Sequence, residues 1–204
     1  MTGHLKSYYK RYMLLFIAFV LGVSAGAFTV NGLSSIQRYD MGNYIEGFVR
    51  LIDSQNIDNT ELFRISIIRN LKLVGLIWVL GVSIIGAPLI FIVMGIRGYI
   101  TGFSSGLIIR MMGAKGLLLS GFAIIPKEIL IVPCIIALGV NGMNFSLNII
   151  KNRSVKAALK DNLRTGFAEY CGVTLFYSLI LFGGVLVEVY IIPVMVKIIT
   201  PILL

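Results

Sequence analysis

The 204-residue sequence is poor in charged residues: 13% are Asp, Glu, Lys or Arg, whereas 57% are hydrophobic. Its mean hydropathy of +0.92 is too high for a water-soluble chain of this length, which could not bury so much apolar surface. Uncharged stretches at 12–37, 73–96, 129–150 and 170–187 approach or exceed the roughly 20 residues that a spanning helix needs. The sequence therefore predicts an all-α, polytopic integral membrane protein.

Histidine occurs once, as His4 in the N-terminal tail. A histidine-based metal site or a Ser-His dyad within the membrane is therefore excluded. The H-E-x-x-H, G-x-S-x-G and P-loop patterns are also missing. We predict no catalytic, cofactor-binding or metal-binding residues, and no enzyme.

The net charge of +9 comes from cations that lie beside apolar stretches. Such cations favour the anionic membrane surface as a partner rather than nucleic acid, for which the sequence has no motif. The only two cysteines, Cys134 and Cys171, fall in or beside predicted spans. We interpret them as small buried hydrophobic residues.

The basic residues predict the orientation. The N-terminal tail has three and no acid, and segment 151–164 has five against one acid, so both should be cytoplasmic. The connection 33–72 balances five basic and five acidic residues, so it can lie outside, with an amphipathic helix over 58–72 at the outer surface. We expect a single membrane domain with an uncleaved first helix, a basic cytoplasmic loop at 151–167 and an extracytoplasmic C-terminus. The five expected spans are about 12–32, 73–96, 98–113, 127–148 and 170–191.

Glycine is abundant in the middle of the chain. Gly98, Gly102 and Gly106 recur at every fourth position, which places them on one stripe of a helix. A stripe of small residues lets a neighbouring backbone approach closely. We predict helix packing at this stripe, which says nothing about chemistry because transporters and scaffolds both use it.

The segment GFAIIPKEILIVP (121–133) interrupts an apolar region with Pro126, Lys127 and Glu128. Because proline fits the first turn of a helix better than its interior, we expect a new helix to begin at Pro126 and residues 116–125 to form a short broken or re-entrant piece. Pro133 should kink that helix again. Non-helical backbone at membrane depth must line a cavity or pack against protein.

Other charges lie within or beside apolar stretches, and charge inside a membrane is costly. We expect Arg97 at the cytoplasmic turn between spans two and three, and Arg110 at the outer end of span three. Glu188 lies inside an apolar stretch. Because spans four and five are consecutive and antiparallel, we nominate Glu188 as the partner of Lys127.

The sequence resembles the stage II sporulation protein M family of endospore-forming bacteria over nearly its whole length. The resemblance rests on the basic tail before the first helix, the Asn70-Leu71-Lys72 entry to the region 67–103, and the proline pair of IIPKEILIVP. Related proteins outside spore formers often carry a His-Gly pair after the first proline, where this chain has Lys127 and Glu128. This departure favours the sporulation branch.

The resemblance implies a scaffold of the engulfment machinery in the mother cell membrane, at the sporulation septum. Its implied partners are stage II sporulation proteins D and P, which degrade peptidoglycan. The alternative is a small transporter or channel component that uses the intramembrane charges near Lys127, Glu128 and Glu188. The sequence leaves open whether the protein forms a homo-oligomer.

Overall fold

The computed structural model describes residues 2–37, 39–43, 47, 59–152 and 159–195. All elements of regular structure in these ranges are helical, as predicted. They include α1 (Thr2–Thr29), the short η1 (Val30–Gly32), α3 (Asn59–Val82), α4 (Gly86–Asn152), α5 (Leu159–Leu186) and the π-helical turn η2 (Val187–Ile191). Residues 35–37, 39–43 and 192–195 are helical as well.

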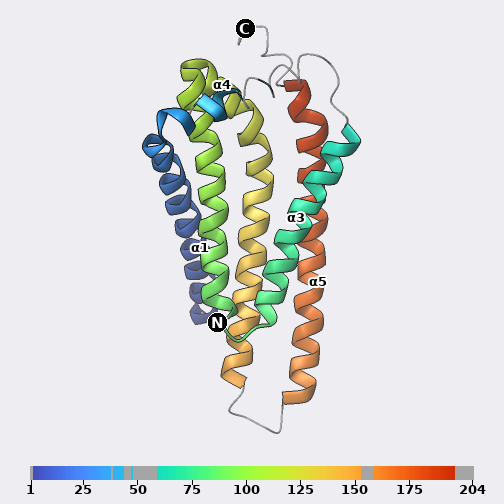
Figure 1. Cartoon of the computed structure of the whole chain (residues 1–204). Helices are drawn as coiled ribbons and strands as arrows, with labels where there is room; N and C mark the ends of the chain where they lie inside the picture. Colours follow the sequence, from blue (N-terminus) through green and yellow to red (C-terminus); the bar gives the residue numbers. More distant parts are fainter. Residues whose placement is uncertain (1, 38, 44–46, 48–58, 153–158, 196–204) are drawn as a thin grey trace.

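The helix α4 reverses direction at Gly113, whose φ of 58° and ψ of −130° lie in a region that glycine adopts readily. It therefore has a first arm, residues 86–112, and a second arm, residues 114–152. Within the described residues, four helices are long and apolar enough to cross a membrane, α4 among them. The two arms of α4 run in opposite directions and lie alongside α1, α3 and α5 (Figure 1). When the arms are counted separately, the four candidate helices give five segments. This confirms the predicted polytopic helix bundle with about five spans.

The boundaries of the second and third predicted spans are wrong. Residues 73–96 do not form one helix, because the chain turns between Val82 and Gly86. Ser83 makes this turn: its backbone N–H donates to Leu80, and its carbonyl accepts from Gly86. A Cβ added at Gly86 would lie only 1.7 Å from the carbonyl oxygen of Leu80, so the turn depends on glycine.

The prediction of a helix that begins at Pro126 is also wrong. Both Pro126 and Pro133 lie inside α4, and no re-entrant piece forms at 116–125. Prolines are tolerated inside membrane helices because neighbouring helices and local adjustments compensate for the lost backbone hydrogen bonds. The break lies instead at Gly113, where the reversal requires a positive φ.

Two predicted connections are shorter than expected. From Asn59 onward, the expected amphipathic segment 58–72 is the first part of α3, which continues without a break to Val82. The bounds of the predicted loop 151–167 are wrong, because α4 continues to Asn152 and α5 begins at Leu159. Residues 153–158 lie outside the described residues. Most of 44–58 and all of 196–204 also lie outside them.

One apolar core joins all the long helices. Its fully buried side chains come from α1 (Leu15), α3 (Ile77), and the two arms of α4 (Ile90, Ile131), and Leu181 adds a contribution from α5. Many large apolar side chains point outward instead, as expected where a helix faces lipid rather than water.

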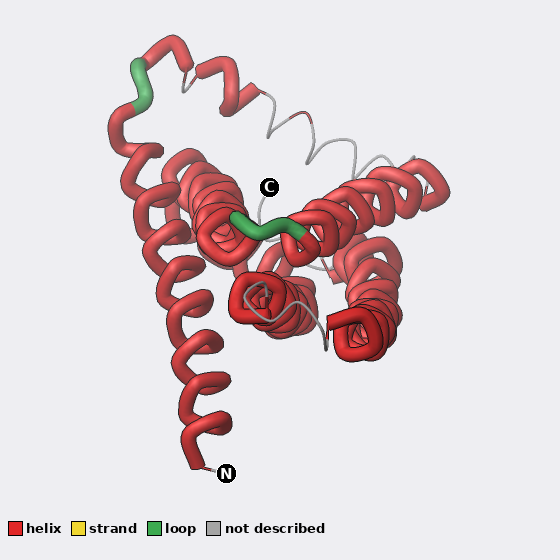
Figure 2. The backbone as a smooth tube through the Cα atoms, turned by 90° about the horizontal axis from the view of Figure 1, so that it is seen from below, coloured by secondary structure: helices red, strands yellow, loops and turns green. Residues whose placement is uncertain are grey.

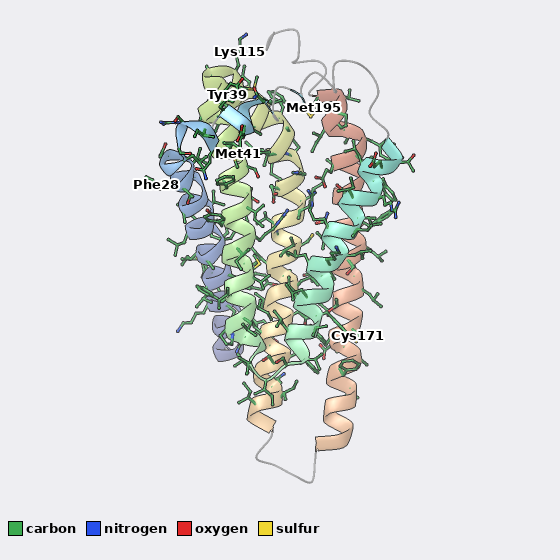
Figure 3. The ribbon with its side chains drawn as sticks, viewed as in Figure 1. Phe28, Tyr39, Met41, Lys115, Cys171 and Met195 are labelled. Carbon is green, nitrogen blue, oxygen red and sulfur yellow. The ribbon has the colours of Figure 1, made fainter. Side chains whose placement is uncertain are left out.

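The two ends of the bundle carry different parts of the chain. Figure 3 places Phe28, Tyr39, Lys115 and Met195 toward the same end, where α4 reverses. The start of α1, the end of α4 and the start of α5 lie at the other end (Figure 1). Both predicted basic cytoplasmic segments thus belong to one end of the molecule.

Candidate functional site

A cluster of five charged side chains lies within the bundle, away from both ends. Lys127 and Glu128 of the second arm form its centre. They are neighbours in sequence, so their side chains leave the helix about 100° apart and reach different helices. Each finds an oppositely charged partner, and with a third ion pair, between Arg69 and Glu188, the cluster connects α3, both arms of α4 and the turn η2 that follows α5.

On one side, Glu128 pairs with Arg97 of the first arm. The guanidinium of Arg97 donates to Glu128 Oε1 over 3.1 Å, and the Thr101 hydroxyl donates to the same oxygen over 3.4 Å. The side chains of Arg97 and Glu128 are only 11% and 14% exposed. The expectation that Arg97 lies at the turn between two spans is therefore wrong: it lies roughly 16 Å along the helix from Gly86.

On the other side, Lys127 Nζ donates to Glu188 Oε1 over 2.9 Å. The contact nominated from the sequence is therefore present. Arg69 of α3 donates to the same oxygen, a partner that the sequence analysis missed. Glu188 lies in the π-helical turn η2, whose irregular geometry often marks functional positions.

Some hydrogen-bonding atoms of the cluster have no partner among the described residues. Arg97 Nε, Glu128 Oε2 and Glu188 Oε2 are buried and have no hydrogen-bond partner among the described residues. The cluster also holds three cations against two carboxylates. The unfilled carboxylate oxygens could accept hydrogen bonds from water or bind a proton, while the paired oxygens hold the helices in register.

The glycine stripe of the first arm packs against α1. A Cβ added at Gly98 would lie 2.2 Å from the carbonyl oxygen of Phe19, and one at Gly102 would lie 2.0 Å from that of Val23. Gly106 faces the backbone of Ala27. The predicted close packing at the stripe is therefore present, and its partner helix is α1.

The remaining candidates have local roles. Asn70 is buried, and its side-chain amide donates to the Ser66 carbonyl one turn earlier over 3.0 Å. Pro126 is half-buried, whereas Pro133 is exposed on the outer surface of α4. Arg110 lies near the end of the first arm, three residues before Gly113, and donates to Asn31 Oδ1 over 3.0 Å. That this end is the outer one stays a prediction.

Sequence reasoning could find Lys127 and Glu188 because adjacent antiparallel spans bring them to similar depths. It missed the contacts of Arg69 and Arg97. Arg97 was expected at a turn between spans, and Arg69 falls in segment 58–72, which was expected at the outer surface. One usable signal is that Lys127 and Glu128 are both expected inside the membrane. A charge buried there is costly unless it is paired, so each of them requires an oppositely charged partner on a neighbouring helix.

These features define a polytopic α-helical membrane protein. The first arm of α4 packs against α1 through glycines, and ion pairs connect it and the other helices on the opposite side. The family described as stage II sporulation protein M matches residues 15–193, so the chain belongs to that family. No curated protein and no solved structure matches the chain.

Proposed function

We propose that the chain is an integral membrane scaffold of the sporulation engulfment machinery, which anchors and localises peptidoglycan-degrading partners at the septum and engulfing membrane. The observation that carries the proposal is the family match over residues 15–193. The tight bundle supports it, because a scaffold needs a rigid body and outward-facing connections rather than a reactive centre.

The proposed partners are stage II sporulation proteins D and P. They would meet the end of the bundle that carries the outer connection 33–72 and the C-terminal region 189–204. The basic residues of the N-terminal tail and of segment 151–164 support a cytoplasmic location for the opposite end. The protein would thus lie in the mother cell membrane with its partner-binding end toward the peptidoglycan.

One pair of positions tests orientation and partnership together. A photo-crosslinking residue placed at Asn56 should capture stage II sporulation proteins D and P in sporulating cells, and the same residue at Asn152 should not. Cysteines at the two positions, in a chain whose Cys134 and Cys171 are replaced, should differ in the same way toward an impermeant thiol reagent. Labelling at Asn152 alone would overturn the orientation, and recovery of a soluble ATPase instead of hydrolases would favour transport.

We also propose that the protein is not an enzyme. The purified chain, incubated with peptidoglycan, should release no muropeptides above a sample without protein. Release by the purified chain alone would defeat the scaffold proposal. Proteins D and P, added together with it, provide the positive control.

A transporter or channel component is the second candidate. The buried atoms Glu128 Oε2 and Glu188 Oε2, which have no hydrogen-bond partner in the part of the chain that the structure describes, favour it. Unfilled acceptors of this kind could carry protons or ions through the bundle. Flux through liposomes that contain the chain, lost on Glu128→Gln, would support this candidate. The scaffold proposal predicts no such flux.

A further inference from the structure

Lys72 of α3 carries a charge that the ion pairs of the cluster do not use. Its side chain is exposed, and it forms no hydrogen bond or ion pair within the described residues. It follows Arg69 by three residues and precedes Ile77, which is fully buried in the core, by five. The depth of Lys72 in the membrane decides what its ammonium can meet.

The level of the turn between α3 and α4 can be found from α1. Residues 12–37 are uncharged, so Arg11 marks one edge of the hydrocarbon layer. Leu15, one turn after Arg11, and Ile90, one turn after the start of α4, lie at the same level. Both meet a Cβ added at Gly139, at 2.8 and 3.2 Å. Because α1 and the first arm of α4 run in the same direction, the turn before α4 lies near the Arg11 edge (Figure 1).

Lys72 lies far from this edge. It stands ten residues before the end of α3 at Val82, which is about 15 Å along the helix, or half the thickness of the hydrocarbon layer. Side chains on a helix lean toward its N-terminus, so the ammonium leans away from the Val82 end. A lysine side chain reaches only about 6 Å, so the ammonium stays inside the hydrocarbon layer.

The charges at this depth do not balance within the described residues. The cluster holds three cations against two carboxylates, and Lys72 adds a fourth cation. The carboxylates Glu128 and Glu188 are only 14% and 13% exposed, so they face the interior and offer nothing to a second copy of the chain. An unpaired charge in hydrocarbon is costly, so Lys72 requires a carboxylate from another molecule.

The face of α3 that carries Lys72 has room for another helix. Among the described residues, α3 contacts only α4, α5 and η2. Seen from below, α3 runs from the green turn at the centre to the side away from α1 (Figure 2). The face has members three or four residues apart, and nothing lies within 4 Å of a Cβ added at its glycine: Ile65, Ile68, Lys72, Gly75, Val79 and Val82. Contact with lipid explains its apolar members but not the lysine at its centre.

We propose that this face of α3 binds a membrane-spanning helix of another protein, which carries an aspartate or glutamate near its middle. The carboxylate pairs with Lys72, and Gly75 lets the two backbones approach closely. A polar residue in such a seam fixes the register of the two helices. The contact would hold a partner of the proposed scaffold within the membrane, but its evidence is the position of Lys72 rather than the family match.

Two synthetic helices of leucine and alanine, about 20 residues long, test the contact. They are identical except for a glutamate or a glutamine at the centre. Energy transfer to the full chain in phosphatidylcholine liposomes at neutral pH measures binding. The glutamate helix should bind roughly tenfold more tightly than the glutamine helix, and a glutamate within one turn of the helix end should lose this advantage. Equal binding of the two central variants by the unmodified chain would overturn the proposal.

A matched pair of lysine variants tests the site. Lys72→Met should lower binding of the glutamate helix to the level of the glutamine helix. Lys10→Met removes an exposed lysine from α1, which does not contact α3 within the described residues, and should change nothing. Thermal unfolding in detergent shows whether Lys72→Met is folded. Equal loss in both variants, or a preference for glutamate that survives in folded Lys72→Met, would overturn the site.

An anionic lipid is the alternative occupant, although its phosphate lies at the membrane surface. Native mass spectrometry of the full chain with phosphatidylglycerol distinguishes the two. If this lipid is retained by the unmodified chain and lost from Lys72→Met, while the two synthetic helices bind alike, then Lys72 holds a headgroup and the proposal is wrong. Such a result would leave the capture of proteins D and P from Asn56 unaffected, so this proposal and the scaffold proposal can fail separately.

Discussion

The first arm of α4 meets its neighbours by two opposite means. Toward α1, glycines bring the backbones into contact, so that a Cβ added at Gly102 would lie 2.0 Å from the carbonyl oxygen of Val23. Toward the second arm, the contact is between charged side chains, Arg97 and Glu128, over 3.1 Å. One interface has no space for a side chain, and the other is made by side chains.

The difference implies different vulnerabilities. The glycine interface does not depend on pH or salt, but it should tolerate almost no added volume. The charged interface can accept a change in side-chain volume. However, removal of a carboxylate would leave the cations that it binds without an opposite charge. Substitutions on the two sides should therefore fail for different reasons.

The largest effect should follow from Gly102→Leu. Because the added Cβ would overlap the backbone of Val23 rather than a flexible side chain, α1 and α4 must separate. We expect a loss of about 4 kcal/mol or more in the free energy of unfolding, which is the range of severe substitutions. Thermal unfolding in detergent measures it.

Gly172→Leu is the matched control, because nothing lies within 4 Å of a Cβ added there and Gly172 is exposed on α5. It should unfold at nearly the same temperature as the unmodified chain. If both leucine variants behave alike, then the Gly98/Gly102/Gly106 stripe faces lipid, and the proposed contrast between the interfaces is lost.

A smaller effect should follow from Glu188→Gln. It leaves Lys127 and Arg69 facing each other without a carboxylate, so we expect a loss of about 3 kcal/mol in the free energy of unfolding. Lys127→Met should cost less, because Glu188 keeps Arg69 as a partner. Protein level and thermal unfolding in detergent measure both, and engulfment should fall in parallel.

The double variant Lys127→Met/Glu188→Gln should be milder than the sum of the single changes, because the two residues share an ion pair. Additive losses would mean that the contact contributes nothing to stability. Single variants that accumulate normally yet abolish engulfment would instead favour a conduction or signalling role for the cluster.

The sequence was sufficient for those features that depend on local pattern. Hydropathy predicted membrane-spanning helices, and the spacing of Gly98, Gly102 and Gly106 predicted a packing surface. Both predictions succeed because hydropathy and residue spacing can be read from one helix alone. The pairing of Lys127 with Glu188 required only that consecutive spans run antiparallel. None of these inferences needed a distance between remote helices.

The errors arose where one residue sets the direction of the chain. The turn after Val82 lies in an uncharged apolar stretch, and hydropathy cannot distinguish such a turn from a continuous span. The reversal at Gly113 was hidden because the chain has 22 glycines and Pro126 is the more conspicuous helix breaker. The misplaced turn then put Arg97 at a helix end, so its pairing with Glu128 was missed.

The smallest effect should follow from Arg69→Gln. The Arg69 side chain is 46% exposed, against 13% for Glu188, and Glu188 retains Lys127 after the change. An exposed ion pair contributes little, so we expect a loss below about 1 kcal/mol, which should shrink further as salt rises. Arg64→Gln is the control, since Arg64 is exposed on the same helix and has no ion pair among the described residues. If Arg69→Gln is as damaging as Glu188→Gln, then Arg69 rather than Lys127 holds the carboxylate, and α3 rather than the second arm of α4 fixes the position of α5.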